Sequence, residues 1–104
     1  MRVEVLHIKE CPSWQEAGAR LEAALAEVGV SARVDYRLLT EASDLEGTPF
    51  AGSPTIVVDG ADLFPVESPV RALACRVYAT PAGLRGAPEV EQIVEALRGL
   101  PRAE

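Results

Sequence analysis

Long hydrophobic runs are missing from this sequence, and so is any asparagine; lysine and histidine each occur once and cysteine twice. No stretch approaches the roughly 20 apolar residues that a membrane-spanning helix needs. The N-terminus leads directly into a strand pattern, without the charged leader, apolar stretch and cleavage site of a signal peptide. We therefore expect a cytoplasmic protein with no membrane partner.

Positive charge is also scarce. The chain has 10 basic and 16 acidic residues, which give a formal net charge of -6. Because such a protein repels phosphate groups, we expect neither nucleic acid nor an anionic membrane surface as a partner.

Residue patterns of several common sites are absent as well. The sequence holds no cysteine and histidine ligands at zinc spacing, no Gly-rich phosphate loop, no paired carboxylates and no Ser-His-Asp set. We predict no metal site and no cofactor. Since a reducing cytoplasm rarely maintains structural disulfides, both Cys11 and Cys75 are considered first as candidates for catalysis or metal binding.

The 104 residues, of which 48% are hydrophobic, suit one compact domain spanning residues 1–104. Period-2 and helical hydrophobic patterns divide the chain into strands and helices. A strand, a helix and a second strand within the first 40 residues indicate parallel pairing and an α/β class. The predicted order is a central strand at 3–8, a helix at 14–28, an edge strand with one wet face at 32–38, a short helix at 40–47, a strand at 55–58, an ordered loop at 61–74, a strand at 73–78 and a helix at 88–98.

Cys11 lies at the junction between the first strand and the first helix. Pro12 suits the first helical position, which places Cys11 near the N-cap. There the unpaired N–H groups and the positive end of the helix dipole favour thiolate over thiol, and the thiolate is the form that attacks disulfides. The alternative is that Cys11 is simply a small core residue.

A second signal is the proline at the entrance of the third strand. Proline is tolerated at the first residue of an interior strand, where the preceding bond can be cis. We therefore predict a cis Ser53-Pro54 bond.

Taken together, the order of elements, Cys-Pro at the first strand-to-helix junction and Ser-Pro-Thr at the third strand resemble the thioredoxin fold over nearly the whole chain. The resemblance implies a four-stranded mixed sheet of order 2-1-3-4 flanked by helices. It places Cys11 at the nucleophilic cysteine and Pro54 at the cis proline, and it assigns substrate binding to Pro12, Ser13, Trp14, Ser53 and Pro54.

Trp14 departs from this pattern, because it occupies the position of the second cysteine in the family's C-x-x-C motif. The combination of Cys-Pro-x-Trp, Gly-Ser-Pro-Thr, Asp-Gly and Cys-Arg-x-Tyr is more similar to a group of small bacterial thioredoxin-like proteins, some of which are labelled alkylmercury lyase-like.

Cys75 is the candidate resolving thiol. If it begins an antiparallel fourth strand, however, it lies at the far end of the sheet, about 10 to 15 Å from Cys11. A disulfide needs Cα atoms within about 7 Å. The alternatives are a buried structural Cys75 and a monothiol route that uses an external thiol.

Other polar and aromatic residues near these cysteines have simpler explanations. Trp14 is expected to plug the core, although it could stack on a substrate. His7 is expected to be a hydrogen-bonded core histidine outside the site. Arg76 and Tyr78 are expected to be solvated.

Three functions remain open. The expected one is thiol redox activity, namely disulfide exchange or redox sensing through Cys11, with a small or protein thiol or disulfide as substrate; as an enzyme it would be a thiol-disulfide oxidoreductase. The second is binding of a soft metal, an organomercurial or an iron-sulfur cluster. The third is an inert scaffold that binds another protein. Redox activity is favoured because it explains a nucleophile position beside a proline.

Overall fold

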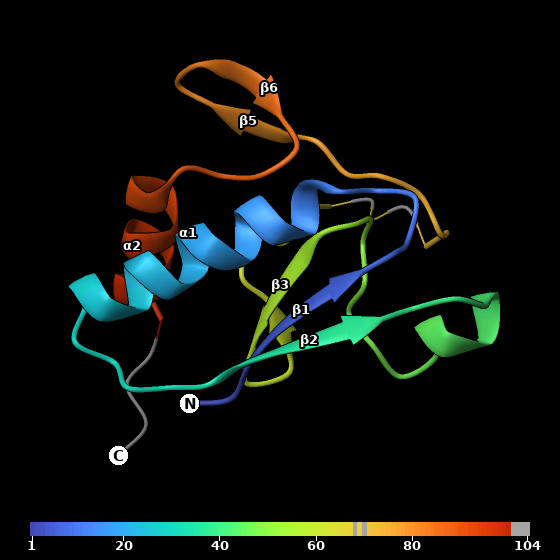
Figure 1. Cartoon of the computed structure of the whole chain (residues 1–104), viewed down its shortest axis with the longest axis horizontal. Coiled ribbons are helices and arrows are strands. Elements are labelled where there is room, and N and C mark those ends of the chain that lie inside the picture. Colours follow the sequence, from blue (N-terminus) through green and yellow to red (C-terminus); the bar gives the residue numbers. More distant parts are fainter. Residues whose placement is uncertain (68, 70, 101–104) are drawn as a thin grey trace.

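The structure is a computed structural model that describes residues 1–67, 69 and 71–100. Its elements follow one another as in Figure 1. They are β1 (Val3–His7), α1 (Ser13–Glu27), β2 (Val34–Leu38), the 3-10 helix η1 (Ala42–Leu45), β3 (Thr55–Val58), β4 (Ala61–Asp62), β5 (Tyr78–Thr80), β6 (Gly83–Arg85) and α2 (Val90–Arg98).

The main sheet is mixed and has the strand order β2-β1-β3-β4. Strand β1 is parallel to β2 and antiparallel to β3, so that Val5 lies between Tyr36 and Ile56. The predicted α/β class, the sheet order, the central first strand and the edge position of β2 are therefore confirmed.

Both α-helices pack on one face of this sheet (Figure 1). Val3 and Val5 of β1 point to this face, because side chains alternate along a strand. They form one core cluster with the other buried residues Leu21, Ala24, Leu25, Ile56, Val58, Leu63, Ile93, Val94 and Leu97. Within the described residues, no helix is long and apolar enough to cross a membrane.

The opposite face of the sheet is covered by η1 and by loops. Leu6 and Val57 point to this face, and their cluster also contains Ile8, Cys11, Leu39, Leu45 and Phe50. Cys11 thus belongs to the core on the side away from the two α-helices.

The predicted strand at residues 73–78 is wrong. The fourth strand is the two-residue β4, which follows β3 directly. Asp59 and Gly60, with φ of 50° and 86°, form a two-residue turn, so Val58 pairs with Ala61. Of the predicted strand, only Tyr78 belongs to one, the separate hairpin formed by β5 and β6.

The helix predictions hold with small shifts. Pro12 is the N-cap of α1 and not its first helical residue. Helix α2 begins after a capping box between Glu89 and Gln92, and the predicted short helix is η1. On β2, Tyr36 and Leu38 are 41% and 48% exposed, so the apolar face predicted for this edge strand is only partly covered.

Candidate functional site

Cys11 and Cys75 form a disulfide. Their Cα atoms are 5.9 Å apart, although 64 positions separate the two residues in the sequence. The expectation that the topology keeps these cysteines too far apart is wrong, because Cys75 is not on the fourth strand.

Cys75 reaches this place because its segment pairs with the backbone of Ser53. The Ser53 N–H donates to the Ala74 carbonyl at 2.8 Å, and the Arg76 N–H donates to the Ser53 carbonyl at 2.8 Å. These two bonds form a parallel bridge between Ser53 and Cys75. A Cβ on Gly52, where φ is 106°, would lie 2.7 Å from the Arg76 Cβ, so this close approach requires glycine.

The Ser53-Pro54 bond is cis, as predicted. Both residues are buried, and each is held by a hydrogen bond to a residue distant in sequence. The Ser53 Oγ accepts a hydrogen bond from the Ile8 N–H at 3.1 Å, and the Tyr78 hydroxyl donates to the Pro54 carbonyl. Ser53 therefore connects the end of the first strand, just before Cys11, to the segment that carries Cys75.

Cys11 occupies the turn that leads into α1. Its N–H donates to the Ile8 carbonyl at 3.4 Å, and Pro12 caps the helix without a side-chain hydrogen bond. The first helical residue, Ser13, is therefore two positions after Cys11, so the positive end of the helix dipole lies next to this cysteine, as the sequence suggested. Ser13 is half-buried and lies so close to Gly86 that a Cβ on that glycine would clash with the Ser13 Oγ.

The two cysteine residues differ in their exposure to solvent. Cys11 is 4% exposed and packs among Leu6, Ile8 and Phe50. Cys75 is exposed, and Val77 near it is 64% exposed. The disulfide therefore joins a core residue to a surface residue.

Residues 71–76, which we call the strap, are fastened at their first residue by Arg71. Its guanidinium donates to the carbonyls of Thr48 at 2.6 Å, Phe50 at 3.2 Å and Leu45 at 2.9 Å. One side chain thus satisfies three carbonyl groups of η1 and the loop that follows it, which cover the face of the sheet away from the two α-helices.

The last residue of the strap is fastened by Arg76. Its guanidinium donates to the Asp62 carboxylate at 2.8 Å and to the Phe64 carbonyl, and it lies 4.5 Å from the centre of the Tyr78 ring. The side chains of Arg76 and Asp62 are only 7% and 9% exposed. The expectation that Arg76 and Tyr78 are solvated is wrong, because β4 brings Asp62 under the strap.

Trp14 lies on the helix-covered side, away from the disulfide cluster. Its ring stacks on His7 at 4.2 Å between ring centres and meets Tyr36 edge-on at 5.6 Å. Trp14 is half-buried against the helix-side core, consistent with a plug.

The prediction that His7 is a buried core histidine is confirmed, since the residue is 7% exposed. Its Nδ1 atom, however, is not hydrogen-bonded to any of the residues that the structure describes. Burial lowers the pKa of His7, so the ring is neutral near pH 7. Because its ring packs on the opposite side of the sheet from Cys11, His7 is not positioned as a base for that thiol.

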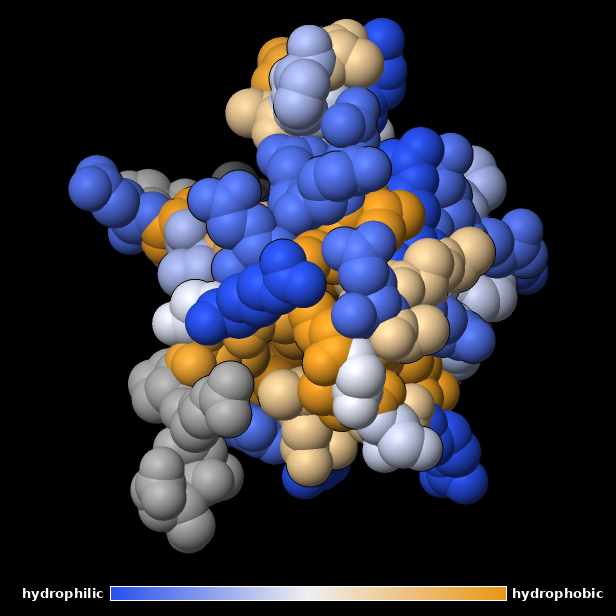
Figure 2. Space-filling view, turned by 90° about the vertical axis from the view of Figure 1, so that its left-hand side faces the viewer, coloured by the Kyte–Doolittle hydropathy of each residue, from blue (hydrophilic) through white to orange (hydrophobic). Residues whose placement is uncertain are grey.

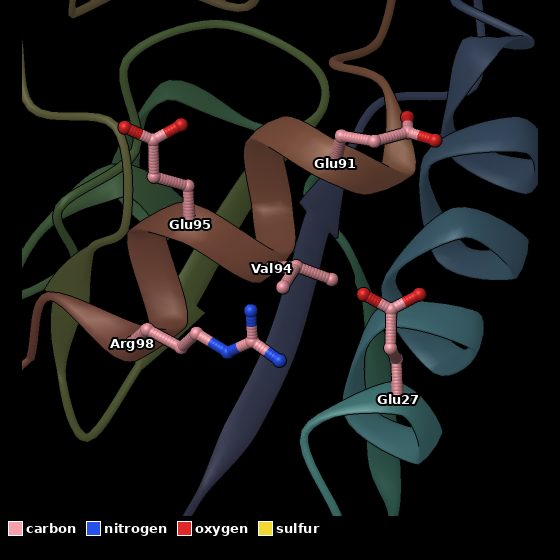
Figure 3. Close-up of a pocket in the computed structure, with 5 residues that line it drawn as sticks. All are labelled: Glu27, Glu91, Val94, Glu95 and Arg98. Atoms are coloured by element: carbon pink, nitrogen blue, oxygen red, sulfur yellow. The ribbon is translucent and has the colours of Figure 1, made fainter.

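A separate groove of about 320 Å³ lies between the two α-helices. Figure 3 shows Glu27 of α1 and Arg98 of α2 extending toward the space above Val94, with Glu91 and Glu95 along α2. On this side of the molecule, hydrophobic surface is visible between charged side chains (Figure 2). Since Glu27 ends the helix that Cys11 precedes, the groove is remote from the disulfide.

Among the described residues, no cluster of three or more His, Cys, Asp or Glu side chains could hold a metal ion. The structure brings together Cys11, Cys75, Ser53 and Pro54, with Pro12 and Ser13 beside them, and turns Trp14 away. Sequence reasoning missed Gly52, Arg71 and the Arg76-Asp62 pair. The one available signal was that an arginine lies four residues before Cys75 and another directly after it.

Comparison of the chain with protein-family models, with curated proteins and with solved structures finds no match, so the disulfide and its surroundings are the basis for assigning a function.

Proposed function

We propose that the protein is a thiol-disulfide exchange protein with a thioredoxin-like fold, in which Cys11 and Cys75 form the redox couple. The observation that carries the proposal is the pairing of these cysteines at the N-terminus of α1, beside the cis Ser53-Pro54 bond. The strand order β2-β1-β3-β4 supports the proposed fold.

The couple would exchange two electrons with its substrate. A substrate thiolate attacks one sulfur of the disulfide, and the other sulfur leaves as a thiolate. A second substrate thiolate then attacks the substrate sulfur of the mixed disulfide. This step releases the substrate as its disulfide and leaves Cys11 and Cys75 reduced; the reverse sequence reduces a substrate disulfide.

Two cysteines within bonding distance favour this dithiol route over the monothiol route. Pro12 is exposed beside the couple and is available to a substrate. Ser53 and Pro54 are buried beside the strap, so their proposed role is to position Cys75 and not to contact the substrate directly.

The test is a titration of the protein in glutathione redox buffers, followed by acid quenching, alkylation and mass spectrometry. We expect a single transition in which both thiols are alkylated together, because they form one bond. In parallel, the reduced protein should convert a coloured disulfide reagent to two free thiols and re-form its own disulfide. The rate of this complete reaction should fall to background in Cys11→Ser and Cys75→Ser, which stop at the mixed disulfide.

The control for these variants is Val77→Ser, which changes an exposed side chain next to the strap without removing a sulfur. It should keep the wild-type rate. Thiols that fail to pair again after reduction, or cysteine variants that keep the full rate, would refute the proposal.

The same proximity supports a second candidate, which is binding of a soft cation by the reduced pair. Two thiolates on residues with Cα atoms 5.9 Å apart suit a soft thiophilic metal ion. Stoichiometric uptake of mercuric ion that protects both thiols from alkylation, without any disulfide exchange, would favour this candidate over the first.

A further inference from the structure

We propose that an external thiol attacks the disulfide at Cys75, and that Cys11 is the sulfur that leaves and later closes the bond again. This inference rests on the proposed function and adds the order of events. It reverses the roles that the resemblance to the thioredoxin family implies, in which Cys11 meets the substrate first.

The first argument is the direction of attack. A thiolate approaches a disulfide along the line of the S–S bond, from the side opposite the leaving sulfur. Attack on Cys11 would have to come through the core residues Leu6, Ile8 and Phe50 that pack around it. Attack on Cys75 comes from the solvent side, because that residue is exposed. The greater exposure of Cys75 therefore favours attack of an external thiol at this residue.

The second argument is the quality of the leaving group. A thiol whose thiolate is stabilised leaves faster in disulfide exchange. Cys11 lies next to the N-terminus of the 15-residue helix α1, whose cap provides no side-chain hydrogen bond. The partial positive charge of this helix end favours a thiolate on Cys11 and counteracts its apolar burial, which disfavours the charged form. Cys75 lies on the strap and not on the turn that leads into this helix.

The third argument is that the strap holds Cys75 in place after the bond breaks. Arg71 is bound to three carbonyls at one end, and Arg76 is bound to Asp62 and Phe64 at the other. The backbone bonds of Ser53 to the strap do not involve sulfur either. A mixed disulfide on Cys75 therefore stays close to the Cys11 thiolate.

The bonds and electrons balance as follows. An external thiolate bonds to the Cys75 sulfur, the Cys11–Cys75 bond breaks, and its electron pair leaves on Cys11. In the reverse direction, the Cys75 thiolate attacks an external disulfide and expels one thiolate. Cys11 then attacks the Cys75 sulfur, expels the second thiolate and restores the bond.

The experiment uses the native oxidised protein and reduced glutathione as the probe. After brief incubation, the mixture is acid-quenched, free thiols are alkylated, and the protein is digested with trypsin. Cleavage after Lys9 and Arg20 isolates Cys11 in peptide 10–20, and cleavage after Arg71 and Arg76 isolates Cys75 in peptide 72–76. At early times, glutathione should be found on peptide 72–76 at least about tenfold more often than on peptide 10–20, which should carry the alkyl group.

A second measurement uses Cys11→Ser and Cys75→Ser with oxidised glutathione, after circular dichroism has compared each variant with wild type. The thiol of Cys75 in the first variant should form the mixed disulfide at least about tenfold faster than the thiol of Cys11 in the second.

The outcomes separate the two proposals. Glutathione mainly on peptide 10–20, or equally on both peptides, would overturn the assignment of roles and leave the exchange function intact. An intact disulfide with glutathione on neither peptide would overturn the exchange function itself.

Discussion

His7 shows how one buried atom sets a pH dependence. Its Nδ1 is buried without a partner in the described part of the chain, and burial lowers the pKa of His7 from its usual 6.5. Below pH 6.5, His7 takes up a proton in the unfolded chain but stays neutral in the folded protein until the pH falls to its lower pKa. The contribution of His7 to stability is therefore full above pH 6.5 and is lost as the pH falls through the lower pKa of the folded state.

We expect His7→Phe to remove this pH dependence. Phenylalanine can keep the stacking on Trp14 but has neither the unpaired nitrogen nor a titrating group. Relative to wild type, the variant should gain free energy of unfolding as the pH is lowered from about 7.5 to about 5.5. Urea denaturation at several pH values measures this gain, and parallel profiles for the two proteins would contradict the explanation.

At the scale of single residues, the sequence predicted the position of Cys11 before the first helix and the cis bond before Pro54, and it missed the two arginines that hold the strap. Cys11 and Pro54 were identified because their local neighbours, a helix start and a strand start, constrain them. Arg71 and Arg76 could not be identified, because an arginine in a loop is ordinarily solvated. Their partners, which include the Thr48 carbonyl and Asp62, are distant in sequence and are brought near only by the complete fold.

Among the secondary-structure elements, α1 and β2 are joined through Tyr36. The ring lies over Gly18, where a Cβ would be 2.5 Å from the Tyr36 Cε1. Its hydroxyl donates to Glu22 at 2.6 Å, and its edge meets Trp14. Burial and, to a lesser extent, the hydrogen bond to Glu22 raise the pKa of Tyr36 to about 12, so the contact is intact near neutral pH.

We expect the effect of Gly18→Ala to change sign with the residue at position 36. Alanine is about 1 kcal/mol better than glycine inside a helix. In wild type the added methyl group must displace the Tyr36 ring, and the net effect should be destabilising. In a Tyr36→Ala background the space is open, and the same substitution should stabilise by up to about 1 kcal/mol.

Urea denaturation of the four proteins in this double-mutant cycle provides the measurement. Ala23→Gly is the matched control, because it changes an exposed position of the same helix. It should destabilise both backgrounds by about 1 kcal/mol. Equal effects of Gly18→Ala in the two backgrounds would show that the Tyr36 ring does not restrict Gly18.

The helices and the long strands were predicted well because each contains enough residues to show a period. Strand β4 has two residues, which is too short for any periodicity to appear. Residues 73–78 were assigned in its place because their apolar residues suit a strand. Residues 73–76 instead belong to the strap, whose backbone pairs with Ser53 outside the main sheet, and Tyr78 begins β5.

For the whole molecule, the disulfide joins the first turn of the fold to its last third. The cross-link closes a loop with a sequence separation of 64, which restricts the unfolded chain much more than the folded one. The hydrogen bonds of Arg71 and Arg76 do not depend on it. We therefore expect the reduced protein to remain folded, with a free energy of unfolding lower by about 2–4 kcal/mol.

This loss is measured by urea denaturation with and without a phosphine reductant. A Cys11→Ala/Cys75→Ala variant is the control, since reductant should leave its stability unchanged. If reductant does not change the stability of the wild-type protein either, the cross-link does not restrict the unfolded chain as described.

At this largest scale, the α/β class and the strand order of the main sheet could be predicted from the sequence. The cysteine pairing was not, because it depends on the path of residues 61–77 between two short hairpins. A composition of 48% hydrophobic residues and a net charge of -6 describes the whole chain and carries no information about that path.

Trp14 is the one tryptophan of the chain, three residues after Cys11, and its indole is held between an imidazole and a phenol. Its fluorescence can therefore be excited selectively and observed without a label. A protonated imidazole quenches a stacked indole, so the emission intensity should follow the charge on His7. The protein thus carries its own optical probe at the start of α1, in a position to record in real time any rearrangement of that turn when the neighbouring disulfide opens.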